Sequence, residues 1–541
     1  VPSLVAGPPD ICAPTDSDGD GVCANREVWF DGKTVTTCAN DLHGPYLGRD
    51  GWVYWCKGAF GEQTHTLVDG STFQSSAAHI YRKRDDSSLI EPLISGGMDN
   101  PVEMAFIPEG EKLFTSTFLQ HPGGGLRDGI AHAVYGGLHG KDHRVIEGHV
   151  RTGGLMPIMT QLGPAGPSGL ICLETDHLVG SLPDSRQQRF LCAALFNLHK
   201  VTAHRLIRDG ASYRTDDYDL LSTDRVDVHP TDVIEDADGS LLVLDTGGWY
   251  DLCCPTSRID QKTASGGIYR ITSKQSREQE ISTEAVDWKS LDPAQTAALL
   301  HDRRPWIRRR ANQIVAQQGD RFVQLLTGVV EDAARSRGDR LNALWSLCQI
   351  GLRSALDVAV GQLDSNDPSL VQAACHVASF HRDQQASAAL RGLLDHSSPQ
   401  IRRAAAEALG RIRDVDAVDR LLHALEQSTD DRHLDHSLLF ALIEIARSDR
   451  EIDLRELATT DKGRYAAILV ADQLGRGAEL DPDELFSAAR RDFAPLRMAA
   501  IDVLSSNPTW STESTTRLGE LWSRLDSDAA AGDVLTEVIA G

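Results

Sequence analysis

A twelve-residue segment near the start of the chain, residues 16–27, carries oxygen-bearing side chains at regular places. It reads D-S-D-G-D-G-V-C-A-N-R-E, with Gly21 at the sixth place, where a sharp turn is needed. This order fits the loop that supplies Ca²⁺ with about six to eight hard oxygen ligands. The expected ligands are the carboxylates at places one, three, five and twelve and the carbonyl at place seven: Asp16, Asp18, Asp20, Glu27 and Val22.

The elements around this segment do not follow the usual helix–loop–helix pattern. Pro8, Pro9 and Pro14 exclude a regular helix before the loop, and residues 26–30 read as a strand. We therefore expect a calcium loop inside a β-domain. The alternative is an acidic turn that is simply solvated.

Composition limits the class of protein. The chain has 541 residues, too many for one core, and a net charge of −24, which would repel a nucleic acid. No apolar run approaches the ~18 residues of a membrane span. It begins at Val1 with no signal-peptide pattern, so we expect a fragment or a processed chain.

The cysteines concentrate in the first half, where eight of the ten precede residue 255. Cys12 and Cys23 bracket the acidic loop, and Cys172 and Cys192 fall on neighbouring predicted strands. An even number of cysteines in a β-rich region allows disulfides and an oxidising compartment, whereas buried free thiols are the alternative. A C-x-x-C-H haem motif is absent.

The first half repeats a strand–turn–strand unit. Prolines at 45, 101, 167 and 230 are 56, 66 and 63 residues apart, and Asp-Gly or Glu-Gly turns follow three of them. This period predicts a β-propeller over residues 1–275, six-bladed and incomplete at its N-terminus.

The second half has a helical period. After a polar linker at 276–290, paired helices open at Pro305, Pro368 and Pro399, where proline fits the first turn. Small residues at packing positions make residues 291–541 resemble HEAT repeats, an all-α solenoid that acts as a scaffold. Cys348 and Cys375 are expected in its core.

Equivalent strand starts meet at one mouth of a propeller channel, which would gather polar residues there. A ring of two histidines with carboxylates is a plausible acid–base or ion site. The alternative is that His-Pro and Asn-Pro only end loops before strands. The residues concerned are His43, Asn100, Ser168 and His229, with Asp41, Asp99 and Asp232 nearby.

A Gly- and His-rich stretch, residues 119–165, contains His139, His143 and His149. A long loop inside a compact domain often marks a binding site, here for a metal or a substrate. The alternative is a surface loop that covers the channel.

Several longer strings carry a resemblance to a known family. They include N-D-L-H-G-P-Y-L-G-R-D-G-W-V-Y-W-C (40–56), G-M-D-N-P-V-E-M-A-F (97–106) and H-P-T-D-V-I-E-D-A-D-G (229–239). With the acidic loop, they resemble the planctomycete-type membrane-bound dehydrogenases, in which a glucose/sorbosone dehydrogenase-like propeller precedes HEAT repeats. Many members end in a c-type cytochrome domain, which this chain lacks.

The resemblance implies pyrroloquinoline quinone beside Ca²⁺, with His43 as the general base that takes the hydroxyl proton. His43 lies closer to its turn than that base does in relatives, and Asp99 and His229 occupy the places of the arginines that hold the quinone. Arg127 and Arg151 could take the place of those arginines, and Asn100, Cys253 and Cys254 are the other predicted cofactor contacts. The two adjacent cysteines could form a vicinal disulfide, one could pair with Cys56, or both could be reduced.

Taken together, the sequence predicts an extracytoplasmic dehydrogenase that oxidises a sugar or polyol, with His43, Asp41, His229 and Asp232 as its acid–base groups. The helical repeats would dock a protein partner, a cytochrome being one possibility. The alternatives are a calcium-dependent lactonase or other hydrolase, and a binding protein without chemistry.

Overall fold

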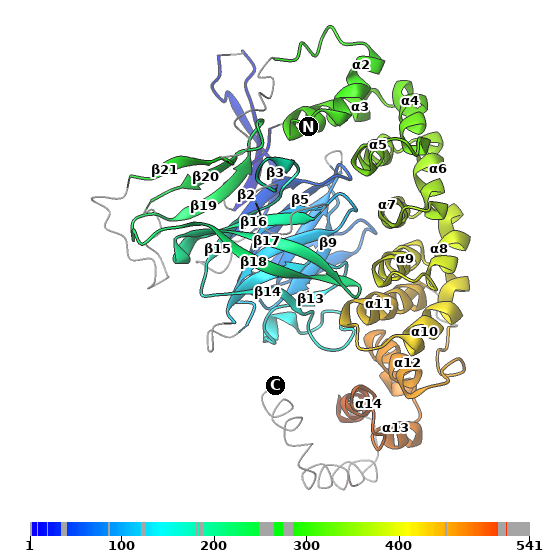
Figure 1. Cartoon of the computed structure of the whole chain (residues 1–541). Coiled ribbons are helices and arrows are strands. Elements are labelled where there is room, and N and C mark those ends of the chain that lie inside the picture. Colours follow the sequence, from blue (N-terminus) through cyan, green and yellow to red (C-terminus); the bar gives the residue numbers. More distant parts are fainter. Residues whose placement is uncertain are drawn as a thin grey trace.

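The chain, in a computed structural model, consists of a β half followed by a helical half (Figure 1). The structure describes residues 3–7, 9–18, 20–33, 41–84, 87–120, 126–179, 182, 188–247, 265–273, 285–448, 452–506 and 516. Within this part of the chain, no helix is both long and apolar enough to cross a bilayer.

The β half begins with two sheets and a hairpin. The first sheet has the order β1 (Val5–Gly7), β2 (Asp10–Thr15) and β3 (Asn25–Asp31). The second has the order β13 (Leu138–His139), β9 (Glu91–Gly96), β8 (Ala78–Lys83), β5 (Val53–Lys57) and β4 (Leu42–Leu47). The hairpin pairs β6 (Gln63–Thr66) with β7 (Thr72–Ser75).

Three antiparallel sheets follow in chain order. One runs β10 (Asn100–Phe106), β11 (Lys112–Thr117), β12 (Asp128–His132) and β14 (Ile158–Gly163). The next runs β15 (Pro167–Cys172), β16 (Arg189–Leu195), β17 (Lys200–Asp209) and β18 (Ser212–Ser222). The last runs β19 (Pro230–Glu235), β20 (Leu241–Asp245) and β21 (Gly267–Ile271).

The predicted turns are confirmed one by one. Gly51, Gly110 and Gly239 all have positive φ, and each lies in a tight connection between a first and a second strand. Glycine adopts this backbone conformation without the steric penalty of a Cβ. Gly110 is constrained a second way, because a Cβ there would lie 2.7 Å from the Trp345 ring.

The first strands of successive sheets lie next to one another. The Asp41 N–H donates to Asn100 Oδ1 across 3.2 Å, which joins the starts of β4 and β10. The Ser168 hydroxyl donates to the Pro230 carbonyl at 3.4 Å, which joins β15 to β19. The strand starts thus meet in neighbouring pairs.

The predicted six-bladed propeller is nevertheless wrong. The described residues form small separate sheets, of two to five strands each, that do not close into a ring. The proline-to-turn repeat specifies each strand–turn–strand unit locally, whereas closure requires contacts between the first and last sheets. A sequence period carries no information about those contacts.

The helical half consists of antiparallel helix pairs. Its helices are α2 (Pro293–Ala298), α3 (Pro305–Gln318), α4 (Asp320–Glu331), α5 (Arg337–Ile350), α6 (Arg353–Gly361), α7 (Pro368–His381), α8 (Ser387–Leu393), α9 (Pro399–Ile412), α10 (Val418–Gln427), α11 (Arg432–Ser448), α12 (Asp461–Gln473), α13 (Pro482–Ala488) and α14 (Ala494–Ser506). Single turns add η5 (Leu299–His301), η6 (Gln362–Asp364), η7 (Gln384–Ala386), η8 (Val415–Ala417) and η9 (Gly477–Glu479). The β half holds α1 (Asp176–Val179), η2 (Arg144–Ile146) and η3 (Phe196–Leu198).

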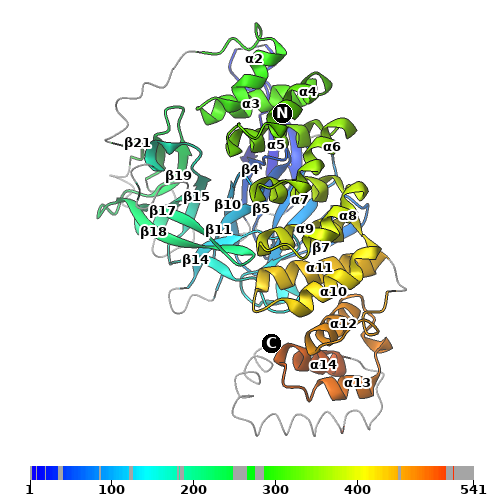
Figure 2. The same ribbon diagram turned by 45° about the vertical axis from the view of Figure 1, so that its right-hand side comes forward.

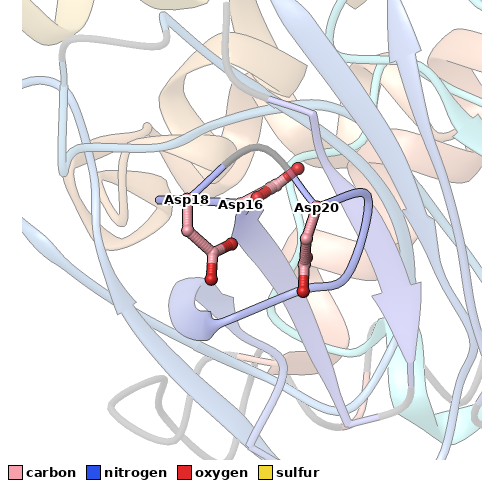
Figure 3. Close-up of side chains that lie close together, drawn as sticks. All are labelled: Asp16, Asp18 and Asp20. Carbon is pink, nitrogen blue, oxygen red and sulfur yellow. The ribbon is translucent and has the colours of Figure 1, made fainter.

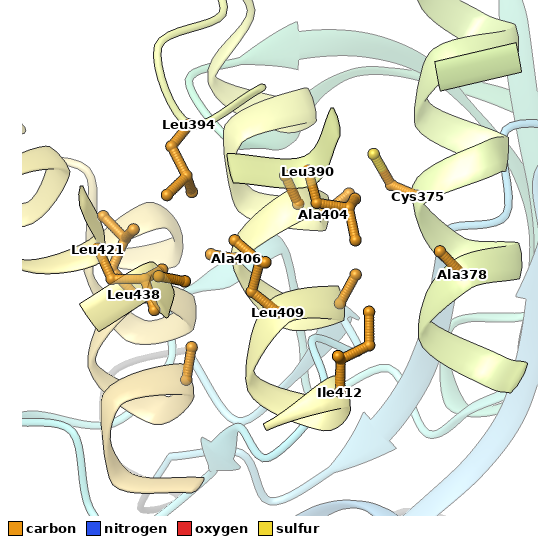
Figure 4. Packing of buried hydrophobic residues seen from close by; sticks show 14 of the residues in the cluster. Cys375, Ala378, Leu390, Leu394, Ala404, Ala406, Leu409, Ile412, Leu421 and Leu438 are labelled. Carbon is orange, nitrogen blue, oxygen red and sulfur yellow. The ribbon is translucent and has the colours of Figure 1, made fainter. Parts of the chain in front are cut away.

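The predicted helix starts at Pro305, Pro368 and Pro399 are confirmed. Leucine, isoleucine and alanine from neighbouring helices form one continuous core, part of which is drawn in Figure 4. Cys348 and Cys375 are buried in that core, as expected. The all-α solenoid interpretation of this half therefore agrees with the structure.

Alternate helices of the solenoid face the β half. Figures 1 and 2 show α3, α5, α7, α9 and α11 next to the sheets, and α4, α6, α8 and α10 on the far side. We call these the inner row and the outer row. Every inner-row helix makes a polar contact with the β half, including Trp345 Nε1 on α5, which donates to the Pro108 carbonyl at 2.8 Å.

Buried ion pairs hold the two halves together at α9. Arg411 donates to Glu91 on β9 at 2.7 Å, and Arg82 on β8 donates to the other carboxylate oxygen at 2.7 Å. Burial disfavours the charge on Glu91, but Arg411 and Arg82 outweigh it and lower its pKa to about 2. Glu91 is therefore ionised inside the protein.

A second buried carboxylate, Glu111, lies just before β11. It accepts from His132 Nε2 at 2.9 Å and from His376 Nε2 on α7 at 3.0 Å, and it pairs with Arg403 on α9. Burial opposes its ionisation, yet these neighbours hold its pKa well below the usual value. Gln372 on α7 also donates a hydrogen bond to the Glu111 carboxylate.

Neutral histidines fill the same interface. His436 on α11 shares a hydrogen bond of 2.7 Å with the Thr152 hydroxyl and one of 2.9 Å with the Tyr135 carbonyl. Burial, assisted by Arg432, lowers its pKa to about 3. His139 on β13 is also buried, and its pKa falls to about 3 for the same main reason.

We predict that acid loosens this interface through His436. The unfolded chain binds a proton below a pKa of about 6.5, whereas the folded protein does not until about 3, so stability falls as pH drops below 6.5. Between pH 7 and pH 5, His436 should account for a loss of about 2 kcal/mol. Urea unfolding of wild type and His436→Gln at both pH values measures it. An equal pH-dependent loss in both proteins would contradict the assignment.

Candidate functional site

The acidic loop lies at the tip of the hairpin formed by β2 and β3. Single carboxylate oxygens of Asp16, Asp18 and Asp20 all lie within 4.8 Å of one another (Figure 3). The loop is shaped by its own backbone: the Gly21 N–H donates to Asp16 at 2.9 Å, and the Val22 N–H donates to Asp20 at 2.7 Å. Gly21 has φ +84°, the turn expected at the sixth place.

The structure brings together three of the five predicted calcium ligands. Val22 follows directly in the same turn, while Glu27 lies on β3, paired with Ala13 and exposed. Three convergent carboxylates with a neighbouring carbonyl are hard oxygen donors of the kind Ca²⁺ binds. The loop is exposed at the tip of a hairpin in the β half.

The cysteines beside this loop are reduced. The described cysteines, Cys23 and Cys56 among them, are all free thiols. Instead of bonding to Cys23, Cys12 accepts a hydrogen bond from Arg26 at 2.8 Å. Of the two possibilities left open by the sequence, the described cysteines show the free thiols.

A second group of polar residues surrounds the start of β4. His43 is paired with Cys56 on β5, and its Nε2 is buried with no hydrogen-bond partner among the described residues. Burial and then the charge of Lys57 lower the pKa of His43 to about 4, so the ring is neutral at pH 7. Lys57 has its own pKa lowered by burial to about 8, against the pull of Asp41.

Asp41 completes this group. Burial raises the pKa of its carboxyl, and Lys57 partly offsets the rise. With Asn100 bonded to its N–H, it joins the starts of β4 and β10. The sequence had indicated Asp41, His43 and Asn100 but not Lys57, whose only signal is a charged residue at the end of the apolar string V-Y-W-C-K.

The other two predicted acid–base residues have different neighbours. The His229 N–H donates to Asp245 at 2.8 Å, and its ring packs on Phe196 at 4.5 Å. Asp232 lies by Glu103, whose pKa is raised well above its usual value by burial and then by Asp232. Glu103 is a further site residue that the sequence did not single out.

Two of the predicted quinone contacts, Arg127 and Arg151, are paired with carboxylates of this chain. Arg127 makes two hydrogen bonds of 2.9 Å to Asp128, and Arg151 pairs with Asp142 at 3.1 Å. A quinone carboxylate at either arginine would compete with that carboxylate for the guanidinium group. Cys253 and Cys254 lie outside the described residues.

The three histidines of residues 119–165 serve separate structural roles. His143 accepts from the Val145 N–H at 3.2 Å and so caps η2. His149 shares a hydrogen bond of 2.9 Å with Ser75, and His139 packs against Phe114. The stretch contains strands rather than one long loop.

Comparison with known proteins gives two family matches. Residues 362–438 match the HEAT repeats, and residues 3–121 match a domain of unknown function (DUF7133). The helical half is consistent with HEAT repeats, which the family model matches over residues 362–438. Such repeats are protein-interaction scaffolds. No curated protein matches the chain.

Solved structures give only distant likenesses. One is a putative oxidoreductase (glucose dehydrogenase) of Thermus thermophilus, 14% identical over 49% of this chain and 92% of that one, with a TM-score of 0.28. Another is the CpcE–CpcF complex of a Nostoc phycocyanin lyase, 20% identical over 45% and 98%, with a TM-score of 0.25. A designed armadillo repeat protein is 15% identical over 40% and 99%, with a TM-score of 0.24. These scores are too low to indicate a function.

We predict that Asp18→Asn weakens calcium binding at the acidic loop at least tenfold, because it removes one of three convergent charges. An exposed loop should bind Ca²⁺ with a Kd of about 0.1–1 mM. Isothermal titration calorimetry on the full chain measures it, with Asp69→Asn, an exposed acid in the turn between β6 and β7, as the matched control. Equal affinities in the two variants would refute the site.

Proposed function

We propose that the chain is an extracytoplasmic, calcium-binding scaffold that binds its partners without transforming them. The observation that carries this is the interface between the halves: the inner row is joined to the β half by buried ion pairs at Glu91 and Glu111. Charges buried in this way fix one arrangement of two surfaces. A fixed arrangement suits a protein that presents binding surfaces.

The outer row is the surface available to a protein partner. The inner row, which solenoids commonly use to hold ligands, is covered here by the chain's own sheets. Exposed apolar side chains lie on or next to outer-row helices, among them Leu325 on α4 and Leu352 just before α6. Such residues among charged ones are typical of protein contacts.

The acidic loop supports a place outside the cytoplasm. A calcium loop with the affinity predicted above would be filled where Ca²⁺ is abundant, as it is on the extracellular and periplasmic side. It does not support the lactonase alternative, which requires calcium next to the reacting carbonyl. The loop lies on an exposed hairpin tip instead.

We predict that Arg411→Ala weakens the interface between the two halves. Glu91 keeps Arg82 as a partner but loses a charged hydrogen-bond donor inside the protein, which should cost about 1.5–3 kcal/mol. The exposed pair Arg420–Asp395 on the outer row provides the control, because Arg420→Ala should cost about 0–1 kcal/mol. Urea unfolding followed by tryptophan fluorescence and circular dichroism measures both.

Wild type should unfold in one transition, seen at the same urea concentration by fluorescence and by circular dichroism. Arg411→Ala should unfold in two separate transitions. Separate transitions in wild type, or equal small losses in both variants, would mean that the halves are not one unit.

One observation favours a second function, oxidation of a sugar or polyol. His43 is neutral, and its Nε2 has no hydrogen-bond partner among the described residues, so in the tautomer with its proton on Nδ1 it could accept a hydroxyl proton. Lys57 and Asp41 beside it have shifted pKa values, which is common at catalytic sites.

This second function predicts dye reduction that depends on His43. The full chain is assayed with a sugar panel, Ca²⁺, added pyrroloquinoline quinone and a dye acceptor. His43→Gln should lower the rate about 100-fold or more, and His423→Gln, an exposed histidine of the outer row, should not. Inactive wild type, or equal rates in the two variants, excludes this chemistry and leaves the scaffold.

A further inference from the structure

A polar cleft of about 340 Å³ lies where the first solenoid helices cover the β half. Its floor is the C-terminal ends of β4, β10 and β15, and its wall is formed by α3 and α5. The Asp41–His43–Lys57 group lies at the opposite, N-terminal end of β4. The cleft is therefore a separate site, and its volume suits a small ligand.

The cleft gathers three arginines around one carboxylate. Glu174 pairs with Arg308 at 2.6 Å, with Arg309 at 3.0 Å and with Arg49 at 3.4 Å. Burial opposes ionisation of Glu174, but the three guanidinium groups lower its pKa. The four side chains carry three positive charges and one negative charge, an excess of two positive charges.

The second carboxyl group in the lining, Glu103, is less readily ionised than an ordinary glutamate. Burial, and then the charge of Asp232, raise its pKa well above the usual value. The Tyr46 hydroxyl donates to it at 3.2 Å. In a chain of net charge −24, this is a local concentration of positive charge.

Two polar atoms in the lining of the cleft have unused hydrogen-bonding capacity. Arg49 Nε, a donor, and Asn312 Oδ1, an acceptor, are both buried with no partner among the described residues. Buried polar atoms are rarely left unsatisfied, and an unsatisfied pair lining one cleft marks a place for a ligand. Arg309 adds an open donor, since its side chain is 64% exposed.

The walls between these groups are apolar. Met104, Phe106, Leu170 and Leu300 line the cleft beside the polar residues. An occupant thus meets donors for an anion at the arginines, an acceptor at Asn312 and carbon surface between them. A hydroxylated organic anion has all three complementary features.

We propose that this cleft binds a small hydroxylated anion, either a carboxylate or a phosphate monoester, with its charged group at Arg49 and Arg309 and a hydroxyl at Asn312. This proposal does not depend on the scaffold function, because it assigns a ligand to a cleft that the scaffold does not use. The anion would also bridge α3 to the sheets.

The test is calorimetric titration of the full chain at constant ionic strength. The probes are gluconate, glucose 6-phosphate, inorganic phosphate and, as the neutral analogue, glucose. The variants are Arg309→Gln and its neighbour Arg310→Gln. Arg310 is exposed on the same helix but does not line the cleft.

Gluconate or glucose 6-phosphate should bind wild type and Arg310→Gln alike, at least tenfold more tightly than Arg309→Gln. Whichever of the two binds identifies the anionic group. Glucose should not bind, and inorganic phosphate should bind more weakly than the organic anion.

The proposal fails if neither organic anion binds wild type, if both variants bind equally, or if glucose binds as tightly as gluconate. Circular dichroism of Arg309→Gln checks that the variant is folded.

Discussion

The arrangement of this protein depends on two carboxylates that remain ionised away from water. Glu91 and Glu111 belong to the β half, and arginines of α9 bind both of them. A buried charge is tolerated only beside its partner, so the sheets and the solenoid can pack together in one register. The coverage of the inner row by the sheets and the cleft beside α3 both follow from that register.

A single helix face supplies most of this chemistry. Arg403, Glu407 and Arg411 are four residues apart on α9, so they lie on one side of the helix, and all three are buried. Glu407 accepts from the Ser379 hydroxyl at 3.0 Å, which ties the same face to α7. The helix therefore bridges its solenoid neighbour and the sheets at once.

Features specified by neighbouring residues were readable from the sequence. The hairpin turns at Gly51 and Gly110 and the helix start at Pro399 depend on local backbone preferences, and the structure confirms them. The three aspartates of the acidic loop converge for the same reason. Asp41 and Asn100 are far apart in the sequence but were expected near each other, because each lies at the start of the first strand of a strand–turn–strand unit. The structure joins them by a hydrogen bond.

Features that depend on distant contacts were not readable. Ring closure of the sheets was predicted from a period and is wrong, because a period describes units and not how the ends of an array meet. Arg403 and Arg411 look like a solvated helix face until the sheets cover them. Arg127 was assigned to a cofactor, but the residue after it, Asp128, already pairs with it. Lys57 and Glu103 gain their unusual character only from burial.

The covered inner row also has a consequence for how such a chain can evolve. An ordinary solenoid can gain or lose a repeat, since each unit touches only its neighbours. Here successive helices reach particular partners in the sheets, as Gln349 on α5 reaches the Arg49 carbonyl and Gln400 on α9 reaches the Ser212 carbonyl. An inserted or deleted helix pair would shift every later side chain away from its partner. The number of repeats between α3 and α11 is thus set by the sheets, and length variation should be confined to the C-terminal end beyond α12.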